Sequence, residues 1–343
     1  MNVPKVLIVG DSRKMKGGVS TVIKTIEKSY LWKKYRCQWV ECQINDSIAM
    51  KILYLLRGII VALFLIPQYD IIHFHGNPGR SIRVQFAIFL YACLWRKKII
   101  LHVHIGNQYT ESVNDKVFAF CCRKADAIVT LGEMWKKYIP VQDPSRVVAV
   151  YNPAPAISTP QSPQKYFLFA AWLSMRYKAY DTLIKGWAIA AHNHPDWKLV
   201  ICGGGEVEGL KKCIREERVG DTVDFLGWIE GEKKHNLFSH AYGYIMTSVQ
   251  EGLPMSVLEA LSEGIPVITT PVGTLPELLT NERDALIYDF NDANGLAQCI
   301  TKLIEDSSIR NQLIKNGQQL VQDVLSTEMF IEKINKIYQS LSR

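Results

Sequence analysis

A repeated alternation of short apolar segments with longer helical patterns is the feature that most limits the fold of this chain. The short segments are rich in Val, Ile and aromatic residues, which favour buried strands. We predict strands at residues 5–10, 70–76, 98–106, 127–132, 146–152, 166–172, 197–205, 222–228, 243–248 and 265–271. Segments with helical periodicity, such as YDTLIKGWAIAAHN, lie between them. This alternation is typical of α/β domains built on parallel sheets.

A proline-rich segment interrupts the alternation near the middle of the chain. Residues 153–164, PAPAISTPQSPQ, contain four prolines and predict a linker. The 343 residues are enough for two domains of ordinary size, so we expect one α/β domain over 1–160 and another over 161–325. Parallel sheets bind ligands at the carboxyl ends of their strands. Two such sheets facing each other would therefore form a cleft lined by the functional residues.

The charge is distributed unevenly between the two halves. Residues 1–165 hold 23 Lys and Arg against 10 Asp and Glu, a net charge of +13, whereas residues 166–343 carry −6. A basic half favours anionic lipids or an anionic substrate, although a solvated basic surface is the alternative for any single cluster. No nucleic-acid-binding motif accompanies the charge, so we expect no nucleic-acid partner.

Two further patterns bear on where the protein acts. The apolar segment 52–66 is shorter than the roughly 20 residues that cross a bilayer, so it predicts a buried or interfacial helix. The eight cysteines include no CxxC pair, which favours a reducing compartment over a disulfide framework. The first residues show no charged leader before a long apolar core, and we expect a cytoplasmic protein.

Histidines gather at two strand ends in the first half. Alternation places His73 and His75 on one face of their strand, and His102 and His104 on one face of the next. His104 stands where its strand should end, a position suited to hydrogen-bonding a ligand, whereas packing under the loops is our default for the first pair. A four-histidine metal site is the alternative, but no carboxylates lie nearby in the sequence, and we expect no metal.

Two glycine-containing loops could approach an anion closely. Gly17 and Gly18 precede a helix, whose first N–H groups can bind phosphate, although a simple turn is the alternative. Gly204 belongs to ICGGGEVEGL, a glycine-rich strand end like those of nucleotide-binding sheets. Arg176 and Lys178 lie in another strand-to-helix loop, where two cations suit a diphosphate if the loop is not merely solvated.

The stretch EGLPMSVLEA carries two glutamates around a predicted helix start. Met255 and Ser256 begin the helix, so their N–H groups can hold phosphate. Glu251 and Glu259 offer acceptor-only carboxylates suited to paired hydroxyls, on a sugar and on a ribose respectively. A glycosidase acid/base pair would leave the phosphate-binding elements unexplained. A surface glutamate with a capping glutamate is the other alternative.

Together these segments resemble a known family. LVICGGGE, VDFLGW, EGLPMSVLEALSEGIPVITTPVGTLPELL and DALIYDFND follow in the order seen in the nucleotide-sugar domain of family 4 retaining glycosyltransferases, within glycosyl transferases group 1. DIIHFHG and HVHIG match the first domain more loosely. The resemblance implies the GT-B fold, with two Rossmann-like domains facing across a cleft. It also implies that the helix predicted over 326–343 crosses back to the first, acceptor-binding domain.

The same resemblance implies an activity. It predicts a hexosyltransferase-type enzyme that moves a sugar, with retention, from a nucleotide-diphosphate-sugar donor to a hydroxyl of a glycan or lipid-linked acceptor. The setting would be cell-surface polysaccharide biosynthesis, in the cytoplasm and peripherally on the inner face of the plasma membrane, in contact with anionic lipid. No metal and no cofactor are expected. The alternatives are a non-catalytic nucleotide-sugar-binding subunit and a phosphorylase-like enzyme of the same fold, which would need pyridoxal phosphate.

Site roles follow by position. Three residues are expected to be catalytic: His104 orients the reacting sugar, Lys178 neutralises the leaving diphosphate, and Glu251 holds sugar hydroxyls. The residues expected to contact the donor are Gly17, Gly18, Arg176, Lys178, Gly204, Ile229, Glu251, Pro254, Met255, Ser256 and Glu259. Among these, Glu259 would bind the ribose and the backbone near Ile229 the base.

One position departs from the family pattern. The family often has Gly-Arg-Leu after the first strand of the second domain, whereas this chain has Ala171-Trp172-Leu173. The Lys-Gly that follows in the family is Lys178-Ala179 here. Arg176 would supply the charge that the missing arginine carries.

Overall fold

The computed structural model describes residues 3–15, 17–104 and 115–342, and it separates the chain into two compact units. Unit 1 comprises Met1–Pro153 and Thr327–Arg343, and unit 2 comprises Ala154–Ser326. The first boundary lies at 153/154, where the sequence had suggested 160/161. The strand at 98–106 was predicted too long: it ends at His102, and residues 105 and 106 lie outside the described residues.

Unit 1 is built on a parallel sheet of six strands in the order β2-β1-β3-β4-β5-β6. Its strands are β1 (Val6–Asp11), β2 (Gln38–Gln43), β3 (Ile71–His75), β4 (Lys98–His102), β5 (Ala127–Thr130) and β6 (Val147–Ala149). β2, at the sheet edge, was not predicted from the sequence. The register pairs His75 with His102 across β3 and β4, which fixes the histidines of the two strands side by side.

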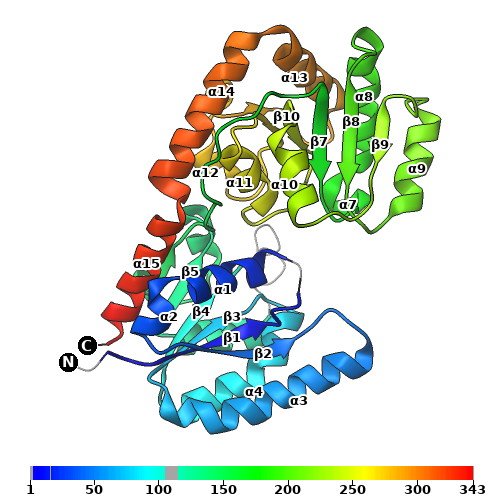
Figure 1. Ribbon diagram of the computed structural model, residues 1–343. Helices are drawn as coiled ribbons and strands as arrows, with labels where there is room; N and C mark the ends of the chain where they lie inside the picture. The colour runs from blue at the N-terminus through cyan, green and yellow to red at the C-terminus, as the bar shows by residue number, and fades with distance from the viewer. Residues whose placement is uncertain (1–2, 16, 105–114, 343) are drawn as a thin grey trace. The chain divides into compact units, whose positions relative to one another are not determined.

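Helices cover both faces of this sheet (Figure 1). One face carries α1 (Gly18–Lys28), α2 (Tyr30–Lys34) and α15 (Thr327–Ser340), and the other carries α3 (Ile48–Leu65) and α4 (Arg80–Leu94). The remaining described helices of the unit are α6 (Lys116–Lys124), η1 (Ile66–Gln68), η2 (Glu133–Tyr138) and η3 (Pro144–Arg146). Side-chain caps help to set the starts: Ser47 accepts from the N–H of Met50 at α3, and Asp115 caps α6.

The C-terminal helix α15 packs in unit 1, far in sequence from its other elements. Its near-helical apolar spacing buries one stripe against the sheet and α1. The buried residues are Phe330, Ile331, Ile334, Ile337 and Tyr338. Polar contacts add to the packing: the hydroxyl of Tyr35 donates to Asn335 Oδ1 at 2.7 Å.

Unit 2 repeats the architecture with the strand order β12-β11-β10-β7-β8-β9, all pairs being parallel. Its strands are β7 (Tyr166–Ala170), β8 (Lys198–Cys202), β9 (Val223–Phe225), β10 (Gly243–Met246), β11 (Val267–Thr269) and β12 (Leu286–Ile287). The helices are α7 (Met175–Lys178), α8 (Tyr180–Asn193), α9 (Val207–Glu216), α10 (Glu232–Ser239), α11 (Met255–Ser262), α12 (Leu275–Leu278), α13 (Ala293–Glu305), α14 (Ser307–Leu320) and the π-helical turn η4 (Val321–Leu325).

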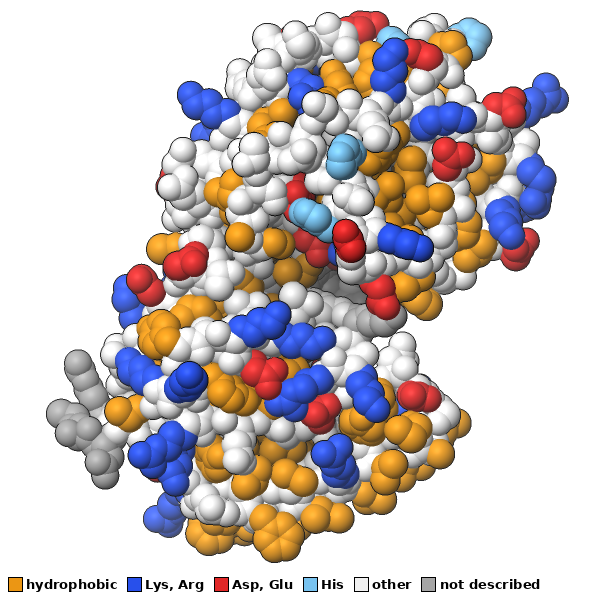
Figure 2. Space-filling model, in the orientation of Figure 1, with side chains coloured by type: hydrophobic (Ala, Val, Ile, Leu, Met, Phe, Trp, Pro, Cys, Tyr) orange, Lys and Arg blue, Asp and Glu red, His pale blue; other side chains and the backbone are white. Residues whose placement is uncertain are grey.

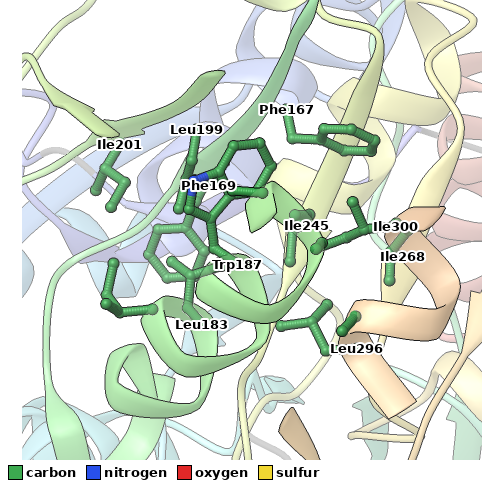
Figure 3. Close-up of a cluster of buried hydrophobic side chains, with 14 of the residues drawn as sticks. Phe167, Phe169, Leu183, Trp187, Leu199, Ile201, Ile245, Ile268, Leu296 and Ile300 are labelled. Atoms are coloured by element: carbon green, nitrogen blue, oxygen red, sulfur yellow. The ribbon is translucent and has the colours of Figure 1, made fainter. Parts of the chain in front are cut away.

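The core of unit 2 forms where α8 and α13 meet the sheet (Figure 3). Trp187 of α8 is fully buried among strand residues such as Phe167 and Leu199. Gly186 lets the helices approach closely, because a Cβ there would lie 2.7 Å from Leu296 of α13. This rigid core holds the carboxyl ends of β7, β8 and β10, from which the site loops extend.

The proline-rich segment is not a free linker. Ser158 donates its N–H to the carbonyl of Ser262 in α11 at 2.9 Å, and Gln318 of α14 donates to the Ser158 carbonyl at 2.9 Å. Ala154 likewise donates to the carbonyl of Leu325 at 2.8 Å. These contacts assign the segment to unit 2 and explain why the boundary precedes it.

Candidate functional site

Two loops of unit 2 are tied together at the carboxyl ends of β7 and β10. The hydroxyl of Thr247 donates to the carbonyl of Lys178, and the N–H of Val249 donates to the carbonyl of Tyr177 at 2.9 Å. Ala179 takes a left-handed conformation, with φ at 44°, and so separates α7 from α8. The two loops thereby fix the backbone of Lys178 beside the strand exit that leads to Glu251.

The tied loops bring Lys178 and Glu251 into contact. The ammonium of Lys178 forms an ion pair with Oε1 of Glu251, and Ser248 donates to the same oxygen at 2.9 Å. Both charged side chains are mostly buried, with 21% and 17% of their surfaces exposed. A partly dehydrated ion pair at a sheet's carboxyl edge can exchange its partner for a ligand of matching charge.

Glu259 does not share that lysine. It lies on α11 and pairs with Lys234 of α10, at 2.6 Å from the ammonium to Oε2 and 2.8 Å to Oε1. The sequence analysis did not single out Lys234, since no spacing rule links α10 to α11. The two glutamates of the EGLPMSVLEA stretch therefore have separate cationic partners.

The start of α11 leaves backbone donors uncapped. Pro254 is the N-cap, and no side chain in the described part of the chain caps the N–H groups of the first turn, which include those of Met255 and Ser256. The preceding loop is held by the turn at Gly273, where φ is +60° and a Cβ would lie 2.3 Å from the carbonyl of Gly252. A half-buried helix start with free N–H groups suits an anionic oxygen.

The glycine-rich end of β8 packs directly on the loop after β7. Gly203 has φ at +146°, and a Cβ there would lie 1.8 Å from the carbonyl oxygen of Ala171. Gly204 faces the ring of Trp172, and a Cβ at this glycine would lie 3.2 Å from that ring. Only glycine permits this approach, so the two loops form one surface.

Two indoles mark this surface. Trp172, at the position where the family often has arginine, is 62% exposed and stands edge to face with Trp228, their centroids 6.4 Å apart. Ile229 follows Trp228 directly and is half-buried. Arg176 is exposed, and its guanidinium lies 5.1 Å from the ring centre of Tyr177.

The remaining predicted residues lie in unit 1. Gly17 is the N-cap of α1, and a Cβ at this glycine would meet no atom of the described residues within 4 Å. Gly18 is the first residue of α1. His104 follows β4, and its backbone N–H donates to Asn77 Oδ1 at 2.7 Å. Its ring Nε2 shares a 2.8 Å hydrogen bond with His75 Nδ1.

His104 closes a stack of four imidazoles under α15. The rings of His73, His75, His102 and His104 lie with neighbouring centroids 4.2 to 5.5 Å apart, and His73 Nδ1 meets the Tyr338 hydroxyl at 2.9 Å. Burial lowers the pKa of His73 and of His104 to about 3, and burial with the neighbouring imidazoles lowers the pKa of the other two well below the usual value. The stack is therefore neutral at pH 7.

Three histidines of this stack are close enough together to be considered as metal ligands. The ligand nitrogens of His73, His75 and His102 lie within 4.8 Å of one another. Two nitrogens bound to one zinc ion are at most about 4.2 Å apart, so the rings would have to shift to bind it. The expectation that no metal is needed stays a prediction.

Asp11 is a further candidate that the sequence analysis missed. It ends β1 at the carboxyl edge of the unit 1 sheet, and burial raises the pKa of its carboxyl to about 6. Its signal in the sequence was weak, because an aspartate after a strand is common in turns.

Two hollows of about 700 Å³ on unit 2 involve none of the predicted residues, so the site loops themselves remain the candidate.

The loops that carry Lys178, Glu251 and the start of α11 fall within a region that matches a known family. Residues 153–320 match the family model for glycosyl transferases group 1. Unit 2 is a glycosyl transferases group 1 domain. This domain contains Lys178, Glu251 and Glu259, and with them the uncapped start of α11.

Relatives of known sequence extend the comparison. An uncharacterized glycosyltransferase of Haemophilus influenzae is 25% identical over 242 residues, which cover 67% of this chain and 64% of that protein. A GDP-mannose-dependent monoacylated alpha-(1-6)-phosphatidylinositol monomannoside mannosyltransferase of Corynebacterium glutamicum is 29% identical over 173 residues, 48% of this chain and 45% of that protein. The chain thus spans about half to two thirds of the length of these relatives.

Solved structures establish the fold of the group 1 domain and its partner unit. HepE of Anabaena, solved with UDP, matches with a TM-score of 0.77 at 16% identity and covers 98% of this chain and all of that one. Sucrose-phosphate synthase of Thermosynechococcus elongatus matches with a TM-score of 0.80 at 16% identity, covering 98% and 99%. The predicted GT-B fold, with two parallel-sheet α/β domains, is confirmed.

Proposed function

We propose that the chain is a family 4 retaining glycosyltransferase that moves a sugar from a nucleoside-diphosphate sugar to a hydroxyl of a glycan or lipid-linked acceptor. The observation that carries the proposal is the Lys178–Glu251 ion pair at the carboxyl edge of the group 1 domain. The uncapped start of α11 belongs to the same loop region. A cation and free amides suit a diphosphate, and a carboxylate suits sugar hydroxyls.

In the reaction we assign Lys178 to the leaving diphosphate. When donor binds, its ammonium would divide its charge between Glu251 and the phosphate oxygens, while Met255 and Ser256 donate backbone N–H groups. The acceptor hydroxyl attacks the anomeric carbon on the side from which the diphosphate leaves, and a departing oxygen takes the proton. The enzyme contributes positioning and stabilisation of the leaving group.

The other residues receive supporting roles. Glu259 holds ribose hydroxyls while keeping Lys234 as its counter-ion, and the backbone near Ile229 contacts the base. From unit 1, His104 orients the sugar and the Gly17-Gly18 turn approaches the donor. Because a lysine and helix amides supply the positive charge, we propose that neither a metal nor another cofactor is required.

Names of similar proteins guide the choice of donor and setting. HepE was solved with UDP and with UDP-glucose, and the Corynebacterium relative is named GDP-mannose-dependent. Another relative is a lipopolysaccharide core biosynthesis glycosyltransferase of Rhizobium meliloti. We place this chain in cell-surface polysaccharide biosynthesis in the cytoplasm, a setting in keeping with its free cysteines.

The test begins with donor binding and ends with turnover. Melting of the purified chain is followed with UDP, GDP, UDP-glucose and GDP-mannose, since a bound ligand raises Tm. Donor hydrolysis and transfer are then measured with and without EDTA. We expect Lys178→Ala to lower kcat by roughly a hundredfold or more. Lys185→Ala, which removes an exposed lysine of α8, is the matched control and should leave kcat unchanged.

Several outcomes would overturn the proposal. Binding without hydrolysis or transfer of any donor would favour a non-catalytic subunit. Absorbance of bound pyridoxal phosphate would favour a phosphorylase-like enzyme. Near-normal turnover of Lys178→Ala would remove the role of the ion pair, inversion at the anomeric carbon would contradict retention, and loss of activity in EDTA would contradict the metal-free scheme.

A further inference from the structure

Unit 1 exposes an extensive apolar surface on the face of its sheet that carries α3 and α4. Of the 19 large hydrophobic residues exposed in the described chain, ten lie on this α3–α4 surface. They are Ile48, Ile52, Leu53, Leu56, Ile60, Leu63, Phe64, Leu90, Leu94 and Trp95. Figure 2 shows hydrophobic side chains gathered along the lower edge of the unit, over these helices. Soluble monomers rarely expose apolar patches of this kind without a partner.

The surface arises because α3 is apolar on both its inner and its outer face, with Lys51 and Arg57 as its charged residues. Its inner face packs on β2 through Tyr54, Gly58 and Ala62, and a Cβ at Gly58 would lie 2.8 Å from that of Cys42. Its outer face is equally apolar, and Phe64 there is 72% exposed. A helix that is hydrophobic on all sides is normally covered, either by protein or by lipid.

The two helices present one continuous surface. The hydroxyl of Tyr91 in α4 donates to the carbonyl of Leu63 in α3 at 3.3 Å. The ammonium of Lys97 donates to the carbonyl of Pro67 at 2.9 Å. These bonds hold the carboxyl ends of the two helices together, so that Phe64 of α3 belongs to the same surface as the end of α4.

The helix is long enough to cross a membrane, but its connections keep it on one side. Ile48–Gln68 is the described segment whose length and composition would allow a span. However, β2 before it and β3 after it both pair in parallel with β1. A crossing would place β2 and β3 on opposite sides of the bilayer and break this sheet. A helix so constrained can lie in the interface plane, with its outer face in lipid.

The net positive charge around the α3–α4 surface indicates which kind of partner it can bind. Residues 47–98 hold seven basic residues and one acidic residue, Asp70. The basic residues are Lys51, Arg57, Arg80, Arg83, Arg96, Lys97 and Lys98. A second copy of the chain, docked symmetrically, would set this basic surface against itself. An anionic lipid surface matches both the charge and the apolar residues.

We infer that the α3–α4 surface docks on an anionic membrane, which goes beyond the proposed function and does not depend on it. The outer face of α3 lies among the headgroups and upper acyl chains, with Phe64 and Leu94 inserted. Trp95 and Tyr91 occupy the level that aromatic residues favour at membrane interfaces. Lys51, Arg57, Arg80 and Arg96 contact lipid phosphates around the apolar area, whereas Arg83 and Lys98 pair with Asp115 and Asp126.

The inference is tested by sedimentation of the full chain with vesicles. One set contains phosphatidylcholine alone, and the other contains phosphatidylcholine mixed with phosphatidylglycerol. Binding is expected to be at least roughly tenfold tighter to the anionic vesicles and to weaken as salt is raised. No sugar donor is present, so failure of this test and failure of the proposed function can be told apart.

Matched variants separate this surface from general hydrophobicity. Ile60→Ser with Phe64→Ser should weaken binding by roughly tenfold or more, because inserted apolar area is lost. Ile189→Ser with Phe290→Ser changes the same residue types at exposed sites of unit 2 and should bind normally. All four positions are exposed, at 55%, 72%, 46% and 42%, so Tm should not fall in either pair.

A second pair of variants tests the charge. Arg57→Gln with Arg96→Gln should weaken binding to the anionic vesicles by about fivefold for each charge removed. Arg215→Gln with Arg218→Gln is the matched control. Arg57 and Arg215 are both exposed helical residues, and Arg96 and Arg218 both have a positive φ. The control should leave binding unchanged.

Three results would overturn the inference. The first is absence of binding to either kind of vesicle, and the second is equal binding by the apolar variants and their controls. The third comes from sedimentation velocity without lipid. A dimer that Phe64→Ser dissociates would show that a second copy covers the surface instead.

Discussion

Acidification is expected to unfold unit 1 through its buried imidazoles. His73, His75 and His102 are at most 1% exposed, and the pKa of each is lowered by burial from the usual 6.5, to about 3 for His73. The unfolded chain therefore binds more protons than the folded one below pH 6.5. Stability is highest above pH 6.5 and falls as the pH drops from 6.5 towards 3.

The size of the loss follows from the same values. At about pH 5, His73, which titrates near 6.5 when unfolded and at about 3 when folded, costs about 2 kcal/mol. Burial lowers the pKa of His75 and His102 in the same direction, so these two residues add to the loss between pH 8 and pH 5. The whole stability of a small domain is only about 5 to 15 kcal/mol.

His102→Leu is the informative variant. Among the residues that the structure describes, neither ring nitrogen of His102 has a hydrogen-bond partner, so leucine removes a titrating group without removing a described hydrogen bond. Urea denaturation at the two pH values, with hydrogen exchange on peptides from β3 and β4, reads the stability of unit 1. The acid loss should be smaller in this variant than in the wild type, and it should stay at the wild-type value in His192→Leu, which replaces an exposed histidine. An equal loss in the wild type and in His102→Leu would refute the reasoning.

Three further predictions concern other parts of the molecule. Gly203→Ala should lower the free energy of unfolding of unit 2 by about 3 kcal/mol, because the new Cβ would clash with the carbonyl of Ala171. Urea denaturation measures this change, and a loss under about 1 kcal/mol would contradict the prediction. Deleting residues 327–343 removes five buried side chains of α15, whose burial contributes roughly 8 to 15 kcal/mol to the stability of unit 1. The amides of unit 1 should therefore lose their protection against hydrogen exchange, and retained protection would show that α15 is dispensable. Arg176→Gln should raise the Kd of the preferred nucleoside diphosphate about fivefold in calorimetry, and an unchanged Kd would mean that Arg176 does not replace the missing arginine.

Periodicity in the sequence was sufficient for most of the fold. Buried strands such as β1 and β8 are nearly continuous apolar runs, and α15 shows its packed stripe at helical spacing. β2 was missed because QWVECQ is an edge strand with polar residues among the apolar ones. β12 has only two residues, too few to form a pattern.

The site was predictable only where one segment carries its chemistry. Glu251 and Glu259 belong to a single loop and helix, and their spacing was visible in the sequence. Lys178 was predicted as a site residue, but its pairing with Glu251 was not, and Lys234 was missed. Both lysines reach the glutamates through tertiary contacts from other loops and helices. Trp172 and Trp228 likewise come together from the ends of β7 and β9, and no sequence spacing predicts that contact.

The place of α15 in unit 1 sets the order in which the chain can fold on the ribosome. Unit 2 has been synthesised in full before the first residue of α15 is made. At about 5 to 20 residues per second, the nascent sheet of unit 1 waits roughly 9 to 35 s for the helix that covers one of its faces. The earlier part of the polypeptide thus stays incomplete while the whole of the later part is synthesised, and it needs protection until the last turns of helix arrive.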